Sequence, residues 1–159
     1  MEEKHEIRVG TWNVQTMNAM GKLENVKEDM QKNRLSIMGV SELRWKDGGD
    51  FVSDGYRVMY AGGPTCQRGV AVIVQAKVAE RGTEIDRFGD RIMVVKVKAD
   101  PVDMVIVPEY LPTTDYENEQ VEKLYDQLEE ILGKQKEQTT LLLWGILTQW
   151  LEKVKRIEW

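Results

Sequence analysis

The sequence is poor in the residues that most often carry metal or nucleophilic chemistry. Its 159 residues include one cysteine, Cys66, and one histidine, His5. A single cysteine excludes an internal disulfide and suits a reducing compartment. A single histidine in a charged N-terminal tail rules out a histidine-rich metal site and disfavours a Ser-His-Asp triad.

Long hydrophobic runs are also missing, so we expect no membrane partner. The charged start, residues 1–6, lacks the apolar core of a secretory signal, which favours an intracellular protein. A net charge of -5 argues against broad electrostatic binding to nucleic acid. It leaves room for a local basic rim, or for a cation that bridges acidic residues to phosphate. The composition, 42% hydrophobic and 31% charged, is typical of a soluble globular domain.

Hydrophobic periodicity predicts a chain in which strands and helices mix. We expect strands over residues 6–14, 35–40, 56–61, 69–75, 90–99, 102–107 and 139–144. We expect helices over residues 22–32 and after a capping-box pattern at Thr114 and Glu117. Residues 46–55 are interpreted as a loop because they contain Gly48-Gly49 and Asp54-Gly55. These elements predict a mixed α/β layered sandwich.

Two of the predicted strands end in polar side chains, Asn13 and Glu42. We expect them at one rim of a sheet, where an amide oxygen beside a carboxylate would suit Mg²⁺. Another interpretation stays open from the residues alone. An asparagine at a strand end is often a turn former, and a lone glutamate is usually solvated.

Three short motifs resemble those of a known superfamily. They are Thr11-Trp12-Asn13, Ser41-Glu42-Leu43-Arg44-Trp45 and Tyr110-Leu111-Pro112-Thr113. In this order the chain resembles the endonuclease/exonuclease/phosphatase superfamily over residues 6–143. It is similar in particular to apurinic-like endonuclease domains of non-LTR retrotransposons and to host proteins of the craniofacial development protein 2 type. The resemblance implies a truncated four-layer α/β sandwich, its N-terminal half to two-thirds, with a site at one end of two packed sheets.

The resemblance also implies Mg²⁺-dependent cleavage of a DNA phosphodiester by an activated water, with Mn²⁺ as the alternative ion. It makes Glu42 the metal ligand, and Asn13 a metal-site residue that supports the ion or contacts phosphate. Tyr110 would position or polarise the scissile phosphate, which completes an expected catalytic set of three residues. Arg44 and Arg91 are expected phosphate contacts, or alternatively structural salt-bridge partners. A nuclear location would fit this role as well as a cytoplasmic one.

Two further motifs of that superfamily do not occur in these 159 residues. A Gly-Asp-x-Asn motif should follow the strand that ends at Leu143, and a later Ser-Asp-His motif should supply a catalytic histidine. The chain instead continues as Trp144-Gly145-Ile146-Leu147. We therefore expect a partial domain over residues 1–143 and a divergent tail over residues 144–159. Loss of a general base typically costs about two to four orders of magnitude in rate, so we expect impaired catalysis.

A frameshift near Leu143 is one hypothesis for the tail. Codons can be chosen for it so that a neighbouring reading frame encodes Gly-Asp-Phe-Asn, and the genomic sequence is the test. The alternative is an ordinary divergent tail, a helix whose apolar positions are Leu147, Leu151 and Val154.

Two classes of function are therefore carried forward. The first is the metal-dependent endonuclease with impaired catalysis. The second is a non-catalytic remnant that acts as a protein-interaction module, with self-association through a sheet face that missing strands would expose. A phosphomonoesterase of the same superfamily is disfavoured because residues 41–45 resemble the retroelement branch. Glu109 is interpreted either as an extra acidic group at the site or as drift.

Overall fold

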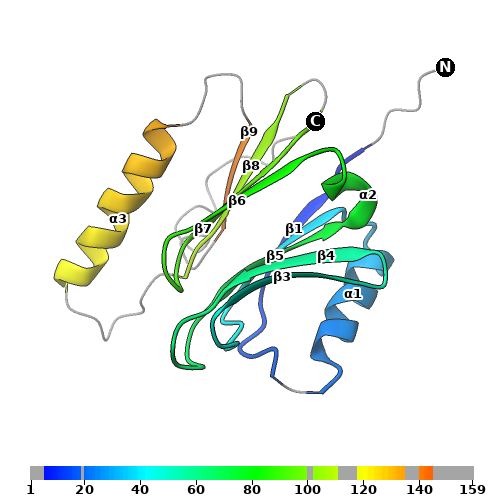
Figure 1. Ribbon diagram of the computed structural model, residues 1–159, viewed down its shortest axis with the longest axis horizontal. Helices are drawn as coiled ribbons and strands as arrows, with labels where there is room; N and C mark the ends of the chain where they lie inside the picture. Colours follow the sequence, from blue (N-terminus) through cyan, green and yellow to red (C-terminus); the bar gives the residue numbers. More distant parts are fainter. Residues whose placement is uncertain (1–5, 19, 100–101, 111–117, 135–139, 145–159) are drawn as a thin grey trace.

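The structure, a computed structural model, describes residues 6–18, 20–99, 102–110, 118–134 and 140–144. Four layers follow one another: helix α1, a five-stranded sheet, a four-stranded sheet and helix α3 (Figure 1). The expected α/β sandwich is confirmed. The predicted tail over residues 144–159 lies outside the described residues except for Trp144, and so does the capping-box pattern before α3.

The first sheet has the strand order β1-β2-β5-β4-β3. Strands β1 and β2 run parallel, and the other pairs are antiparallel. Helix α1, Lys22–Lys32, covers its outer face with Val26 and Met30, which are fully buried. The strand bounds are β1 Val9–Asn13, β2 Ile37–Ser41, β3 Gly48–Ser53, β4 Tyr56–Ala61 and β5 Val70–Gln75.

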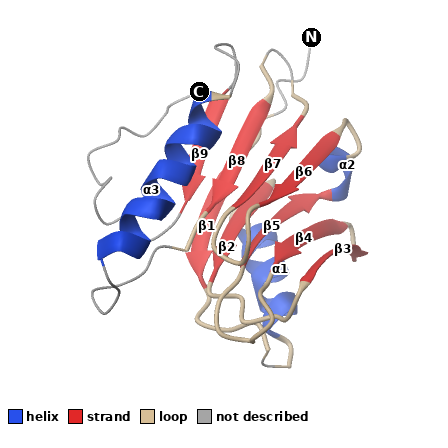
Figure 2. Ribbon diagram, turned by 60° about the vertical axis from the view of Figure 1, so that its left-hand side comes forward, coloured by secondary structure: helices blue, strands red, loops and turns tan. Residues whose placement is uncertain are grey.

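The second sheet has the order β6-β7-β8-β9, and helix α3, Asn118–Gly133, lies over its outer face (Figure 2). Leu128 and Ile131 of α3 pack there against buried side chains of β7 and β8. A short helix α2, Ala76–Ala79, joins the two sheets. The strand bounds are β6 Thr83–Arg87, β7 Met93–Val97, β8 Met104–Pro108 and β9 Thr140–Trp144.

The central core lies between the two sheets. Alternate residues of β5, namely Val70, Val72 and Val74, face β7 and β8 and are completely buried. Each fully buried valine side chain contributes roughly 1.5 to 3 kcal/mol through removal from water. This packing corrects the expectation of an open apolar face on the first sheet, because the described strands of the second sheet cover it.

The sequence predicted most of these strands, with two exceptions. Residues 48–53, expected in a loop, form the edge strand β3, which pairs with β4 through a turn at Asp54-Gly55. Strand β6 was not predicted, because its residues 83–87 include a single apolar side chain, Ile85. Both strands lie at sheet edges and are largely exposed, so alternation with a buried face is weak in them.

None of the helices in the described ranges has the length and apolar character needed to cross a lipid bilayer.

Candidate functional site

The structure brings Asn13 and Glu42 together at the ends of two parallel strands. The register of β1 and β2 pairs Asn13 with Ser41, so the next residue, Glu42, begins at the same rim. Asn13 Nδ2 lies 3.4 Å from Glu42 Oε1. Asn13 Oδ1 accepts a hydrogen bond of 3.1 Å from the backbone N–H of Gln15. In this orientation Asn13 supports the carboxylate, whereas a metal-facing oxygen would require the amide to turn over.

Glu42 has a backbone conformation that side-chain-bearing residues seldom adopt. Its φ is 55°, and Arg44 and Asp47 in the same loop have φ values of 58° and 61°. Non-glycine residues in this left-handed region are uncommon and cluster at functional sites, because the surroundings must hold them there. The loop over residues 42–47 therefore needs contacts on both sides.

Backbone hydrogen bonds hold this loop between its two neighbours. On one side the carbonyl of Leu43 accepts a bond of 2.9 Å from the Met17 N–H, and Asn18 Nδ2 donates to the Arg44 carbonyl at 2.8 Å. On the other side the N–H groups of Leu43 and Arg44 donate to the carbonyls of Gly69 and Arg68, at 3.1 and 2.9 Å. These bonds fix the direction in which the Glu42 side chain leaves the chain.

Glycine at position 62 is required by the close approach of the loop. A Cβ atom there would lie 2.1 Å from the Trp45 carbonyl oxygen and 2.5 Å from that of Asp47. Both contacts are with backbone, so a side chain at this position would push the loop away from strand β4.

The carboxylate of Glu42 is partly sheltered but reachable, with 18% of its side chain exposed. The guanidinium of Arg44 lies 4.0 Å away and is itself 47% exposed. In the described residues no three His, Cys, Asp or Glu side chains gather as a metal site would require. One carboxylate with waters and phosphate oxygens is nevertheless a common binding set for Mg²⁺. The donors at Glu42 fit that ion.

Tyr110 and Arg91 belong to the second sheet. Tyr110 follows the end of β8, and Arg91 lies in the turn that leads into β7. The Tyr110 N–H donates to the Arg91 carbonyl at 2.7 Å, so the two residues are neighbours. Tyr110 is partly buried and packs against the core between the sheets. Arg91 has 9% of its surface exposed, which makes it a buried residue. Strands β2 and β8, which lead to Glu42 and Tyr110, finish at the same end of the sandwich (Figure 1).

Glu109 lies on the other side of the second sheet from the expected site. It forms a bridge with Ile92, and strand alternation places it on the face of Val105 and Val107, beneath α3. It is 1% exposed, and neither carboxylate oxygen has a hydrogen-bond partner among the described residues. Burial raises its pKa to about 7. This placement disfavours the interpretation of Glu109 as an extra acidic group next to Glu42. The alternation of residues 105–109 along the strand was the feature of the sequence that could have indicated the buried position.

The architecture and its relatives define the class of protein: the chain has the endonuclease/exonuclease/phosphatase fold. The endonuclease domain of TRAS1, a telomere-specific non-LTR retrotransposon, has a TM-score of 0.60 at 16% identity, covering 88% of this chain and 58% of that domain. The AP endonuclease LMAP from Leishmania major has a TM-score of 0.65 at 12% identity, covering 86% of this chain and 54% of that one. No protein-family model matches the chain.

The chain is similar in sequence to a part of craniofacial development protein 2. It is 35% identical to the protein from Bos taurus and 33% identical to that from Tragulus javanicus, each over 130 residues. These matches cover 81% of this chain and 22% of each relative, so the chain spans about a fifth of the length of the curated relatives it matches. The resemblance seen in the sequence is thereby confirmed at the level of fold and relatives.

Proposed function

We propose that this domain is an endonuclease-like phosphodiesterase of retrotransposon descent that binds Mg²⁺ and DNA but, as these 159 residues, cleaves poorly. The observation that carries the proposal is the Asn13–Glu42 pair, held at 3.4 Å on a clamped loop at the end of the sandwich. The names of the structural relatives support a DNA substrate. They include a retrotransposon endonuclease domain, an AP endonuclease and a D. rerio TDP2 solved with a single-stranded DNA product.

Glu42 would hold the ion, and Mn²⁺ could replace Mg²⁺ at the same oxygen ligands. A bound divalent cation neutralises the charge that builds up on phosphate during hydrolysis. Asn13 would keep the Glu42 carboxylate oriented through its amide N–H. Tyr110 would donate its phenol hydrogen bond to a phosphate oxygen, and Arg44 would contact a neighbouring phosphate. Arg91 is buried, and its backbone carbonyl holds Tyr110 in place. Its guanidinium would contact a phosphate only if that phosphate entered the site.

The proposal of impaired catalysis rests on the sequence. Neither a Gly-Asp-x-Asn nor a Ser-Asp-His motif occurs in it, and its one histidine, His5, lies outside the described residues. A carboxylate, an amide and a phenol can bind metal and phosphate. None of them is the histidine that the missing Ser-Asp-His motif would supply for proton transfer.

Metal binding and plasmid nicking together test the proposal. We expect the chain to bind Mn²⁺, which electron paramagnetic resonance would detect. We expect the Glu42→Ala variant to lose this binding. The matched control is Glu84→Ala, which removes an exposed glutamate at the start of β6 and should leave binding unchanged. Nicking with Mg²⁺ should be slow and should depend on Glu42.

Two of the possible results would contradict the proposal, and one would disqualify the nicking assay. Equal Mn²⁺ binding by the parent chain and Glu42→Ala would remove the metal site. Nicking that survives Glu42→Ala would come from a contaminant. Rapid nicking that requires Glu42 would show that the catalytic groups are complete.

A further inference from the structure

A tight turn of the second sheet, held against the loops of the first sheet, carries an exposed aromatic ring. The turn joins β6 to β7, and it closes through a 3.0 Å hydrogen bond from the Phe88 N–H to the Ile92 carbonyl. Gly89 has φ 82°, the left-handed conformation that glycine adopts without strain. Phe88 is 36% exposed. A single exposed phenylalanine needs no function, so its surroundings decide the matter.

The residue before Phe88 fixes the turn to the first sheet. Arg87 Nε donates to the carbonyl of Tyr60 at 3.1 Å, and its terminal nitrogen donates to the carbonyl of Gly49 at 2.9 Å. The residues after it meet the β4–β5 loop, where Arg68 lies 3.9 Å from Asp90. The ring of Phe88 therefore stands on a turn that is held from both sides.

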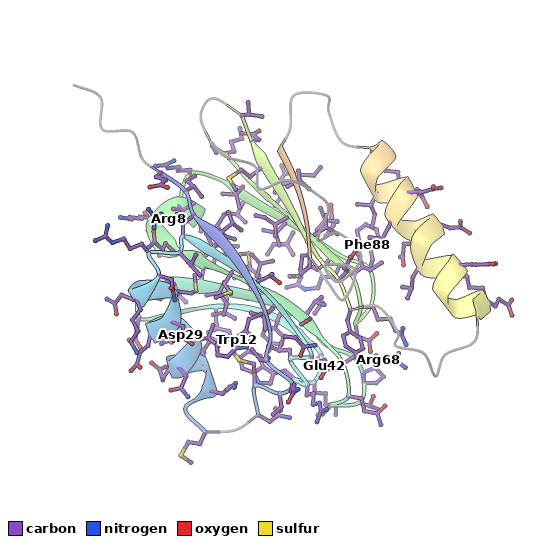
Figure 3. All side chains as sticks on the ribbon, turned by 180° about the vertical axis from the view of Figure 1, so that it is seen from behind. Arg8, Trp12, Asp29, Glu42, Arg68 and Phe88 are labelled. Atoms are coloured by element: carbon purple, nitrogen blue, oxygen red, sulfur yellow. The ribbon has the colours of Figure 1, made fainter. Side chains whose placement is uncertain are left out.

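The loops around this turn are locally basic although the chain is acidic. Residues 42–47, 62–69 and 87–92 together contain five Lys or Arg and three Asp or Glu, whereas the whole chain has a net charge of -5. Arg44 and Lys46 of this group are exposed, and Arg68 is partly so. Figure 3 labels Glu42 and Arg68 near each other, and Phe88 apart from them on the side of α3. Arg44, Lys46 and Arg68 are therefore the cations that this region offers to a phosphate backbone.

We propose that Phe88 is a stacking surface for an unpaired base of DNA whose backbone follows these cations toward Glu42. This inference rests on the proposed function and names its substrate class: a single strand, or a duplex with an unstacked nucleotide, in preference to an intact duplex. Basic grooves that carry an exposed aromatic ring bind single strands in this way, because every base offers a π-face.

The other exposed phenylalanine makes the choice of Phe88 specific. Phe51 on β3 is 37% exposed, almost the same as Phe88. Its ring, however, already packs with Trp45 and Tyr60, at centroid distances of 6.0 and 6.2 Å. Among the described aromatic residues no such ring contact is found for Phe88. The two phenylalanines are therefore equally exposed, but only the ring of Phe88 is not already packed against another described aromatic ring.

The test measures binding of a fluorescein-labelled single-stranded oligonucleotide of about 12 nucleotides, the size that one such groove covers. Ca²⁺ replaces Mg²⁺ so that cleavage does not interfere. We expect Phe88→Ala to weaken binding by about five- to a hundredfold, the effect of losing one stacked base. Phe88→Trp should bind like the parent chain, and Phe51→Ala should leave affinity unchanged. An oligonucleotide of the same length made of abasic sugar-phosphate units should not distinguish Phe88→Ala from the parent chain.

The outcomes separate this inference from the proposed function. Unchanged affinity in Phe88→Ala, or an equal loss with the abasic oligonucleotide, overturns the stacking role and leaves the metal site standing. A selective loss in Phe88→Ala supports stacking, even where Glu42→Ala still binds Mn²⁺ and thereby overturns the metal site. Tighter binding of the intact duplex than of the single strand overturns the substrate class.

Discussion

Asn13 donates through its amide nitrogen toward Glu42, with Nδ2 and Oε1 3.4 Å apart, while its oxygen is held by the backbone of Gln15. The carboxylate thus gains a fixed neighbour from another strand. Two parallel strands that end in register are sufficient to create this pair, because Asn13 lies opposite Ser41. A carboxylate oriented in advance binds a cation without first losing its own freedom of rotation.

Replacement of Asn13 by alanine should weaken Mn²⁺ binding without abolishing it. Removal of a residue that orients a metal ligand typically costs about ten- to a hundredfold in affinity. Isothermal titration calorimetry with Mn²⁺ would measure the effect. Asn33→Ala is the control, because Asn33 lies at the end of α1 and its side chain donates locally, to the Asp29 carbonyl. An affinity equal to that of the parent chain would show that the amide does not support Glu42.

Alanine at position 62 should destabilise the fold and disturb the site together. The added Cβ would meet two backbone oxygens of the loop over residues 42–47, and backbone cannot move aside as a side chain can. We expect a loss of about 2 to 3 kcal/mol in the free energy of unfolding, typical of overpacking in a tight space. Urea denaturation measures it, and Mn²⁺ affinity of the folded fraction reports on the loop.

Gly133→Ala is the matched control for that substitution. A Cβ at Gly133, the last residue of α3, has nothing within 4 Å. Alanine there should leave stability unchanged or raise it by a few tenths of a kcal/mol, since alanine favours helices. If both variants unfolded at the same urea concentration, the close approach at Gly62 would not be constraining the loop.

Glu109 should make the folded state less stable as the pH rises. Burial raises its pKa from 4.5 to about 7, so between these values the unfolded chain releases this proton and the folded chain keeps it. The unfolded state then binds fewer protons, and the free energy of unfolding falls with rising pH. A shift of this size corresponds to about 3 kcal/mol at pH 7 and above. Below the unfolded pKa the penalty vanishes.

Glu109→Gln checks the assignment, because glutamine keeps the shape and removes the charge. The difference in unfolding free energy between Glu109→Gln and the parent chain should grow from pH 4.5 to pH 7 in favour of the variant. Glu129→Gln, on an exposed position of α3, should show no such trend. A constant difference across this range would mean that Glu109 ionises normally in the folded state.

The sequence was informative where burial leaves a clear hydrophobic pattern, either along one face of a helix or throughout a central strand. The predicted strand over residues 35–40 and the helix over residues 22–32 correspond to β2 and α1, because burial produces the hydrophobic pattern by which they were predicted. The polar ends of β1 and β2 were predicted to meet, and they do. Strand β3 was missed because Gly48 and Gly49 read as breakers, although the pairing with β4 accommodates them.

Other features depend on contacts between distant segments and leave no local pattern. The clamp on the loop over residues 42–47 consists of backbone bonds to 17–18 and 68–69, which any sequence of similar size could make. The availability of the Phe88 ring depends on the absence of an aromatic neighbour among the described residues. The roles proposed for Tyr110, Arg44 and Arg91, the domain boundary at residue 143 and the frameshift hypothesis stay predictions.

Arg87 gives the two sheets a fixed offset at their common end. Its guanidinium bonds to carbonyls of β3 and β4, so sliding of one sheet over the other would break both contacts at once. Phe88 belongs to the second sheet and Glu42 to the first. The number of nucleotides between a base stacked on Phe88 and a metal ion at Glu42 would therefore be set by the contacts of one arginine.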